Sequence, residues 1–115
     1  MRDNQLSDDG AGDEDDFGEG GGVPPEATVR VLRISNQKGL HARASAKFVQ
    51  TVERYDAEVR VSRGGEIVGG TSIMGLMMLA AGKDTEIAVA AWGQQKDEVL
   101  VALEVLVNDR FGEGD

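Results

Sequence analysis

The feature that most constrains the fold of this chain is a repeated change of hydrophobic period between residues 27 and 111. Some segments are rich in β-branched residues or alternate between apolar and polar residues, which is typical of strands. These strand-like segments are residues 27–35, 57–62, 66–69 and 84–92. The segments between and after them have apolar residues at helical spacing. These helix-like segments are residues 41–55, 73–81 and 95–111.

The predicted order β-α-β-β-α-β-α favours the α+β class, as a two-layer sandwich. We expect a four-stranded antiparallel sheet with three helices on one face. Gly64 and Gly65 form a hairpin turn signal between the second and third strands. Strand 57–62 alternates between an apolar face and a face that we expect to be solvated, with Ser62 on the solvated side.

Charge divides the chain into two parts. Residues 1–26 hold nine of the 21 acidic residues and one base, a net charge of −8 out of the chain's −9. This Gly- and Asp-rich segment has almost no apolar surface to bury, so we predict a disordered acidic tail over 1–26. Its expected role is solvation, and the alternative is a specific docking role. Pro24 and Pro25 mark the boundary with a domain over 27–112.

Several classes of function are disfavoured. The domain has no excess of basic residues, so we expect no nucleic-acid partner. We find no apolar run long enough to span a membrane and no signal peptide, which predicts a cytoplasmic protein without membrane partners. The chain has no cysteine and one histidine. Because zinc and iron sites need several thiolate or imidazole ligands, we expect no metal and no cofactor.

The single histidine, His41, stands in the segment "NQKGLHARAS" at the start of the first predicted helix. From position alone it can be an ordinary capping residue. Gly39, however, permits a tight turn, and the first turn of a helix favours an anion. Arg43 can hold an oxyanion in the same turn. A neutral imidazole nitrogen among such groups is suited to accepting a phosphoryl group.

Two motifs resemble those of one family. "GLHARASAKFV" resembles the active-site segment Gly-Leu-His-Ala-Arg-Pro-Ala of HPr, the histidine-containing phosphocarrier protein of the phosphoenolpyruvate-dependent phosphotransferase system. "TSIMGLMML" resembles the second signature of that family, around a regulatory serine. The resemblance covers residues 27–112 and implies the family's open-faced β-sandwich.

The resemblance implies a phosphocarrier rather than an autonomous enzyme. His41 would accept a phosphoryl group on Nδ1 from phosphorylated enzyme I and pass it to a histidine of an enzyme IIA protein, with Arg43 stabilising the phosphate. This chain departs from the family where Ala44 and Ser45 replace Pro and Ala. Ala44 restores a backbone N–H and loosens the first turn.

Ser72 precedes the second predicted helix, where an ordinary N-cap serine is common. The resemblance implies instead a regulatory site phosphorylated by HPr kinase/phosphorylase. That helix is apolar on nearly every side, and we expect Leu76, Leu79 and Ala80 to be buried. Met74 and Met77 then face outward, and the resemblance implies that Ile73, Met74 and Met77 dock partners.

Three questions stay open from the sequence. The chain fits both the sugar-transport carriers and the nitrogen-related regulatory branch of the family. One alternative is a regulatory α+β binding module that uses the Ser72 face without phosphoryl transfer, and another is a homologue that has lost transfer. We expect a monomer, because a small carrier must present one face to successive partners.

Overall fold

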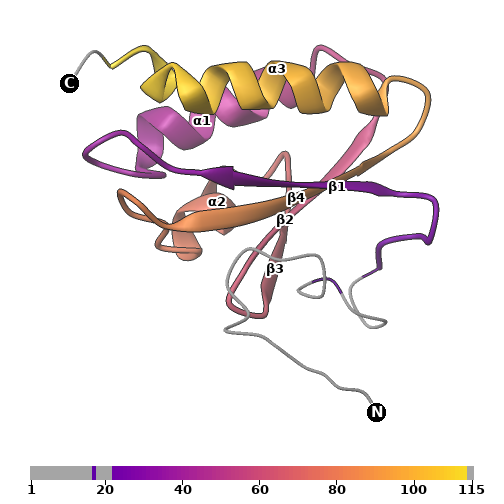
Figure 1. Cartoon of the computed structure of the whole chain (residues 1–115), viewed down its shortest axis with the longest axis horizontal. Coiled ribbons are helices and arrows are strands. Elements are labelled where there is room, and N and C mark those ends of the chain that lie inside the picture. The colour runs from indigo at the N-terminus through magenta and orange to yellow at the C-terminus, as the bar shows by residue number, and fades with distance from the viewer. Residues whose placement is uncertain (1–16, 18–21, 114–115) are drawn as a thin grey trace.

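A computed structural model of the chain describes Phe17 and residues 22–113. These residues contain the predicted order of four strands and three α-helices (Figure 1). The strands are β1 (Thr28–Arg33), β2 (Glu58–Arg63), β3 (Glu66–Gly69) and β4 (Glu86–Trp92). The helices are α1 (Ala42–Val52), α2 (Ile73–Met78) and α3 (Lys96–Asn108), and the short 3₁₀-helix η3 (Arg110–Gly112) follows α3.

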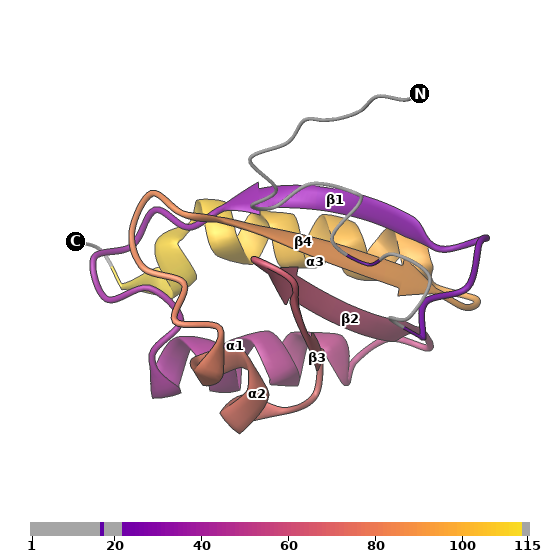
Figure 2. The ribbon, with the colours of Figure 1, turned by 90° about the horizontal axis from the view of Figure 1, so that it is seen from below.

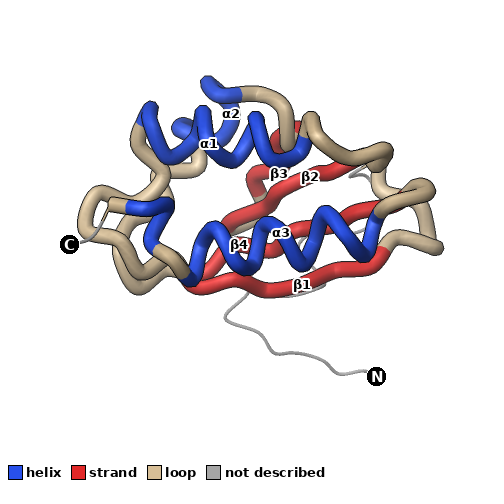
Figure 3. Tube along the Cα trace, turned by 90° about the horizontal axis from the view of Figure 1, so that it is seen from above, coloured by secondary structure: helices blue, strands red, loops and turns tan. Residues whose placement is uncertain are grey.

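The strands form one antiparallel sheet in the order β1-β4-β2-β3. The helices α1 and α3 lie side by side above the sheet (Figure 1), and α2 packs beside α1 near β3 (Figure 3). In the view from below, β1 and β4 lie in front of α3 (Figure 2). The predicted α+β class, with its four-stranded antiparallel sheet, is therefore confirmed.

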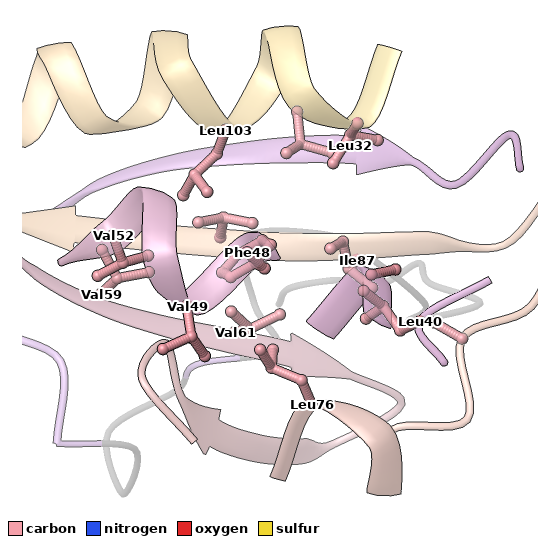
Figure 4. Close-up of a cluster of buried hydrophobic side chains, with 14 of the residues drawn as sticks. Leu32, Leu40, Phe48, Val49, Val52, Val59, Val61, Leu76, Ile87 and Leu103 are labelled. Carbon is pink, nitrogen blue, oxygen red and sulfur yellow. The ribbon is translucent and has the colours of Figure 1, made fainter. Parts of the chain in front are cut away.

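The main core lies between the sheet and the helices (Figure 4). Side chains alternate along each strand, so every second residue of the central strands points into this core. The strands contribute Leu32, Val59, Val61, Ile87 and Val89, all buried. The helices contribute Phe48, Val49 and Val52 from α1, Leu76 from α2, and Val99 and Leu103 from α3. This core holds both ends of α1 in place, and with them the loop before it.

The second helix is shorter than predicted and ends at Met78, ahead of Gly82. The N–H groups of Leu79 and Ala80 bond to carbonyls three residues earlier, which tightens the last turn. Ala80 then takes a left-handed φ of 53° and is exposed. The prediction that Ala80 is buried was wrong, and Ala81 occupies the buried position instead.

The first and last helices are also shorter than the periodic pattern. The first ends at Val52 and the last at Asn108. Beyond α3, Arg110 and Phe111 adopt φ values of 56° and 55°, which a continued helix cannot contain. The buried side chain of Phe111 closes this end of the core. Bulky residues rarely adopt such angles, so the turn is locally strained and the packing of Phe111 holds it.

The outer face of β2 is not solvated throughout, contrary to the prediction. Ser62 is fully buried, and its hydroxyl has no hydrogen-bond partner within the described part of the chain. In the sheet it lies between Ala88 of β4 and Ile67 of β3. Most of the predicted disordered tail, residues 1–26, falls outside the described residues. The exceptions are Phe17, which is buried against this outer face, and residues 22–26.

Candidate functional site

His41 occupies the N-cap of α1, with φ −73° and ψ −177°. Its side chain makes no capping bond, and the backbone N–H of Ser45 donates to its carbonyl at 2.8 Å. The N–H groups of the first helical turn have no partner four residues back in an α-helix. A helix that begins without a side-chain cap leaves these donors, and the positive end of its dipole, for an anion.

The loop before His41 is held by a close backbone contact. Gly39 has a φ of +63°, and a Cβ at this position would overlap the carbonyl oxygen of Ala81. The neighbouring N–H of Leu40 donates to that same oxygen at 2.9 Å. The buried side chain of Asn36 donates to the carbonyl of Gly39 at 2.9 Å. The loop therefore requires glycine at residue 39, which confirms the tight turn predicted there.

The imidazole of His41 contacts a carboxylate from the far end of the chain. Its Nε2 meets Oε2 of Glu113, while Oε1 of Glu113 accepts from Nδ2 of Asn36 at 3.1 Å. An ionised carboxylate only accepts hydrogen bonds, so this contact favours the ring form with its hydrogen on Nε2. Within the described part of the chain, Nδ1 of His41 has no hydrogen-bond partner. That nitrogen keeps its lone pair.

Three basic residues surround the same site. An open hollow of about 550 Å³ is lined by Lys38, His41, Ala42, Arg43, Lys47, Gly112 and Glu113. Nζ of Lys47 donates to the carbonyl oxygen of Phe111 at 2.6 Å, which fixes that ammonium group at the rim. Arg43 is exposed and makes no hydrogen bond or ion pair among the described residues. Its guanidinium is therefore available to a ligand, and the hollow is suited to an anion.

The two residues that depart from the family motif lie on the inner side of α1. Ala44 and Ser45 are both fully buried. The hydroxyl of Ser45 donates to the carbonyl of Leu40 at 3.1 Å, so it ties the first turn of the helix to the residue before His41. The departure therefore adds a hydrogen bond to the loop as well as restoring the N–H of Ala44.

Ser72 is the N-cap of α2, and the ordinary capping role is the one that the structure displays. Its Oγ accepts from the backbone N–H of Gly75 at 2.9 Å, and the residue is half-buried. In α1 no side chain caps the N–H groups of the first turn, whereas in α2 the Ser72 side chain caps one of them.

The helix after Ser72 presents several apolar side chains to the surface. Ile73 and Met77 are 40% and 39% exposed, and Met74 and Met78 are 69% and 68% exposed. The prediction that Met74 and Met77 face outward is confirmed, and Met78 joins them. Met77 also shares a shallow hollow of about 280 Å³ with Lys38 and His41. One continuous surface therefore joins the histidine to an exposed apolar helix.

Comparison with known proteins assigns the family. Residues 28–109 match the family model described as "PTS HPr component phosphorylation site". The chain is 53% identical over 85 residues to phosphocarrier protein HPr of Pseudomonas aeruginosa, covering 73% of this chain and 94% of that protein. It is 49% identical over 84 residues to the phosphocarrier protein HPr of Neisseria meningitidis, with coverage of 73% and 94%. This chain belongs to the HPr family. It is thus a phosphocarrier of the phosphotransferase system.

Solved HPr structures have the same fold. HPr from Thermoanaerobacter tengcongensis, 33% identical, superposes with a TM-score of 0.73 over 76% of this chain and 99% of that one. HPr from Bacillus anthracis, 34% identical, gives a TM-score of 0.68 over 71% of this chain and 98% of that one. The family match begins at residue 28, so the acidic tail lies outside it.

Sequence reasoning missed several residues at this candidate site. Glu113 lies 72 residues from His41 in the chain, and no local pattern marks it. Lys47 falls within the first predicted helix but was given no role at the site. Asn36 gave no signal beyond its place in a turn-forming segment, yet it is fully buried and contacts both Gly39 and Glu113.

The described residues hold no group of three His, Asp or Glu side chains arranged to bind a metal ion. Over the same residues, none of the helices is both long and apolar enough to cross a bilayer.

Proposed function

We propose that His41 carries the phosphoryl group in this HPr protein. Phosphorylated enzyme I donates that group, with phosphoenolpyruvate as its ultimate source, and a histidine of an enzyme IIA protein receives it. The observation that carries the proposal is the contact of His41 Nε2 with Glu113, because Nδ1 then has no partner among the described residues and lies beside three basic side chains. The cytoplasmic location and the monomeric state stay predictions.

The transfer needs no net proton movement at His41. The lone pair of Nδ1 attacks phosphorus and forms a new N–P bond, while the donor atom keeps the electron pair of the bond that breaks. The ring then carries positive charge, which it shares with its Nε2–H. The Glu113 carboxylate lies against that hydrogen and stabilises the charged ring. Transfer to the acceptor reverses these steps at the same nitrogen.

The basic residues act on the phosphoryl oxygens. Charge spreads over these oxygens in the transition state, and preorganised cations stabilise it there. Arg43 is free to approach with two parallel N–H donors, whereas Lys47 is already held by the Phe111 carbonyl. We therefore propose Arg43 as the residue that follows the phosphoryl group and Lys47 as a fixed positive charge beside it.

The test is intact-mass spectrometry after incubation with phosphoenolpyruvate, magnesium and an active enzyme I. We expect one added phosphoryl mass that is lost in acid and is absent from His41→Ala, which keeps the wild-type circular dichroism spectrum. Phosphate should then pass to an enzyme IIA protein. If wild type gains no mass while another carrier does, the alternative of a regulatory module without phosphoryl transfer is favoured instead.

We also propose that Ser72 is a regulatory site for HPr kinase/phosphorylase. A phosphate on the Ser72 hydroxyl would lie at a helix N-terminus, where negative charge is favoured, and it would add a dianion to the apolar surface of α2. With kinase and ATP, we expect an acid-stable phosphoryl mass in wild type and in His41→Ala but not in Ser72→Ala. Equal phosphorylation of Ser72→Ala would place the site elsewhere.

The exposed side chains Ile73, Met74 and Met77 are proposed as the docking surface for enzyme I and enzyme IIA. Met77 supports this best, because it shares a hollow with His41. Met77→Glu should weaken enzyme I binding by calorimetry without changing the unfolding midpoint. The matched control is Val105→Glu, which places the same charge on an apolar residue of α3 that is 62% exposed. Equal loss of binding in both variants would exclude a specific role for Met77.

A further inference from the structure

The outer face of the sheet is covered, although the three helices pack against the other face. Alternation along β4 turns Ile87, Val89 and Ala91 toward the helices and leaves Ala88 and Ala90 on the outer face. Both of these alanines are nevertheless 0% exposed. In an open-faced sandwich such residues would face water, so another part of the chain must lie over them.

Phe17 is that part. Its side chain is only 4% exposed and forms a second apolar cluster with Ala88 and Ala90. Val29 lies directly across from Ala90 on β1, and Ile67 lies beyond Ser62 on β3. The small side chains of Ala88 and Ala90 on β4 thus lie between the larger side chains of Val29 and Ile67. The space above the two alanines accommodates one aromatic ring.

The path of the chain favours contact within one molecule. Val23 and Ala27 also pack against this second cluster, and Ala27 immediately precedes β1. Val23 and Ala27 therefore lie on the same face of the sheet as Phe17. A connection of about ten residues raises the effective concentration of its end far above that of a second molecule. Phe17 is also the one aromatic residue among residues 1–26, which makes it the natural anchor of this segment.

We propose that Phe17 anchors the acidic tail on the outer sheet face of its own molecule. The surface consists of Val29, Ile67, Ala88 and Ala90, and its occupant is the phenyl ring of Phe17. The acidic charge is then held on the side of the sheet opposite the helices, instead of moving freely around the domain. The anchoring residue, Phe17, lies outside the family match, whereas the surface that it contacts lies within it.

A spin label tests the attachment directly. The chain has no cysteine, so Gly12→Cys gives one unique site for a nitroxide in the full-length protein. We expect strong broadening of the amide signals of Ala88 and Ala90, and little at Val105 on α3. Adding Phe17→Ala to the labelled protein should remove the broadening. Broadening that persists in the Phe17→Ala variant, or that is absent from β4 in the parent, would overturn the proposal.

Two controls separate the alternatives. Mixing spin-labelled, unenriched protein with unlabelled ¹⁵N protein detects contact between copies, and broadening of comparable strength there would overturn attachment within one molecule. Phe17→Ala should also lower the folding equilibrium constant by about tenfold, since a buried aromatic side chain is lost. Leu6→Ala, the matched apolar change in the same tail, should leave it unchanged. Equal effects of the two variants would also count against a specific anchor.

Discussion

The two helix starts that carry the family motifs, at His41 and at Ser72, are built differently. The N-cap of α1 makes no side-chain bond, whereas Ser72 Oγ accepts from Gly75 N–H in α2. The first helix thus offers its donors to a ligand, and the second satisfies one of its own. Phosphoryl transfer needs an anion site that is open before the reaction. By contrast, the proposed phosphorylation of Ser72 would modify an oxygen that already caps a helix, so the two sites differ in what the phosphoryl group meets.

The largest effect should come from disrupting the tight turn before His41. Gly39→Ala combines a positive φ with an overlap at the Ala81 carbonyl, and we expect a loss of about 3 kcal/mol in unfolding free energy. Gly64→Ala is the matched control, because its φ is +59° but nothing lies within 4 Å of the added Cβ. It should cost about 1 kcal/mol in urea unfolding. Equal costs would show that the close contact with Ala81 is unimportant.

Next in size is the removal of Arg43, the exposed cation in the first turn of α1. Arg43→Ala should slow phosphoryl transfer from enzyme I by about 100-fold, because a donor to the transition-state oxygens is lost. Rapid-quench kinetics measure this rate. Arg54→Ala removes an exposed cation just beyond the other end of α1 and should change the rate by less than about twofold. A similar rate loss in both variants would indicate general electrostatic attraction instead of a site at the helix start.

A smaller effect should follow from neutralising the partner of His41. Glu113→Gln keeps the size of the side chain but replaces a charged acceptor with an amide, and we expect transfer to slow by about tenfold. Ring ¹⁵N chemical shifts of His41 should also show a smaller fraction of the form with hydrogen on Nε2. Unchanged shifts with unchanged kinetics would remove Glu113 from the mechanism.

The smallest effect should come from removing the side chains at the two N-caps, Ser72 and His41. Ser72→Ala should lower the unfolding free energy by about 1 kcal/mol, because Gly75 N–H loses its acceptor. His41→Ala removes no capping bond and only a partly exposed contact with Glu113, so it should cost about 0.5 kcal/mol. Urea unfolding of both variants tests the order, and a larger cost at His41 would contradict it.

Local patterns predicted what is local in this molecule. The order of elements followed from periodicity, and Gly39, His41 and Arg43 could be placed at one helix start because they are neighbours in the chain. The motif resemblance then supplied a chemical role for them. The β3 bounds were predicted without error, since glycine pairs at 64–65 and 69–70 stand on either side of a short β-branched run.

The failures share a physical cause, which is contact between distant residues. Glu113 reaches His41, and the carbonyl of Phe111 reaches Lys47, only because η3 turns back toward α1. Ala80 departs from its helix where the chain approaches Leu40, and Ser62 is buried beneath an outer surface that strand alternation assigned to water. None of these packing relations leaves a periodic signal along the sequence.

The strand order β1-β4-β2-β3 has a consequence for how the chain folds during synthesis. The hairpin of β2 and β3 is local, but the neighbour of β1 is β4, the last strand to leave the ribosome. The sheet therefore closes only through contacts of long sequence separation, which are slow to form. Until β4 has been synthesised as far as Trp92, β1 cannot pair with its neighbour in the sheet, and Phe17 cannot pack against Ala88 and Ala90. The segment from Phe17 to β1 therefore takes up its native contacts only after β4 has formed.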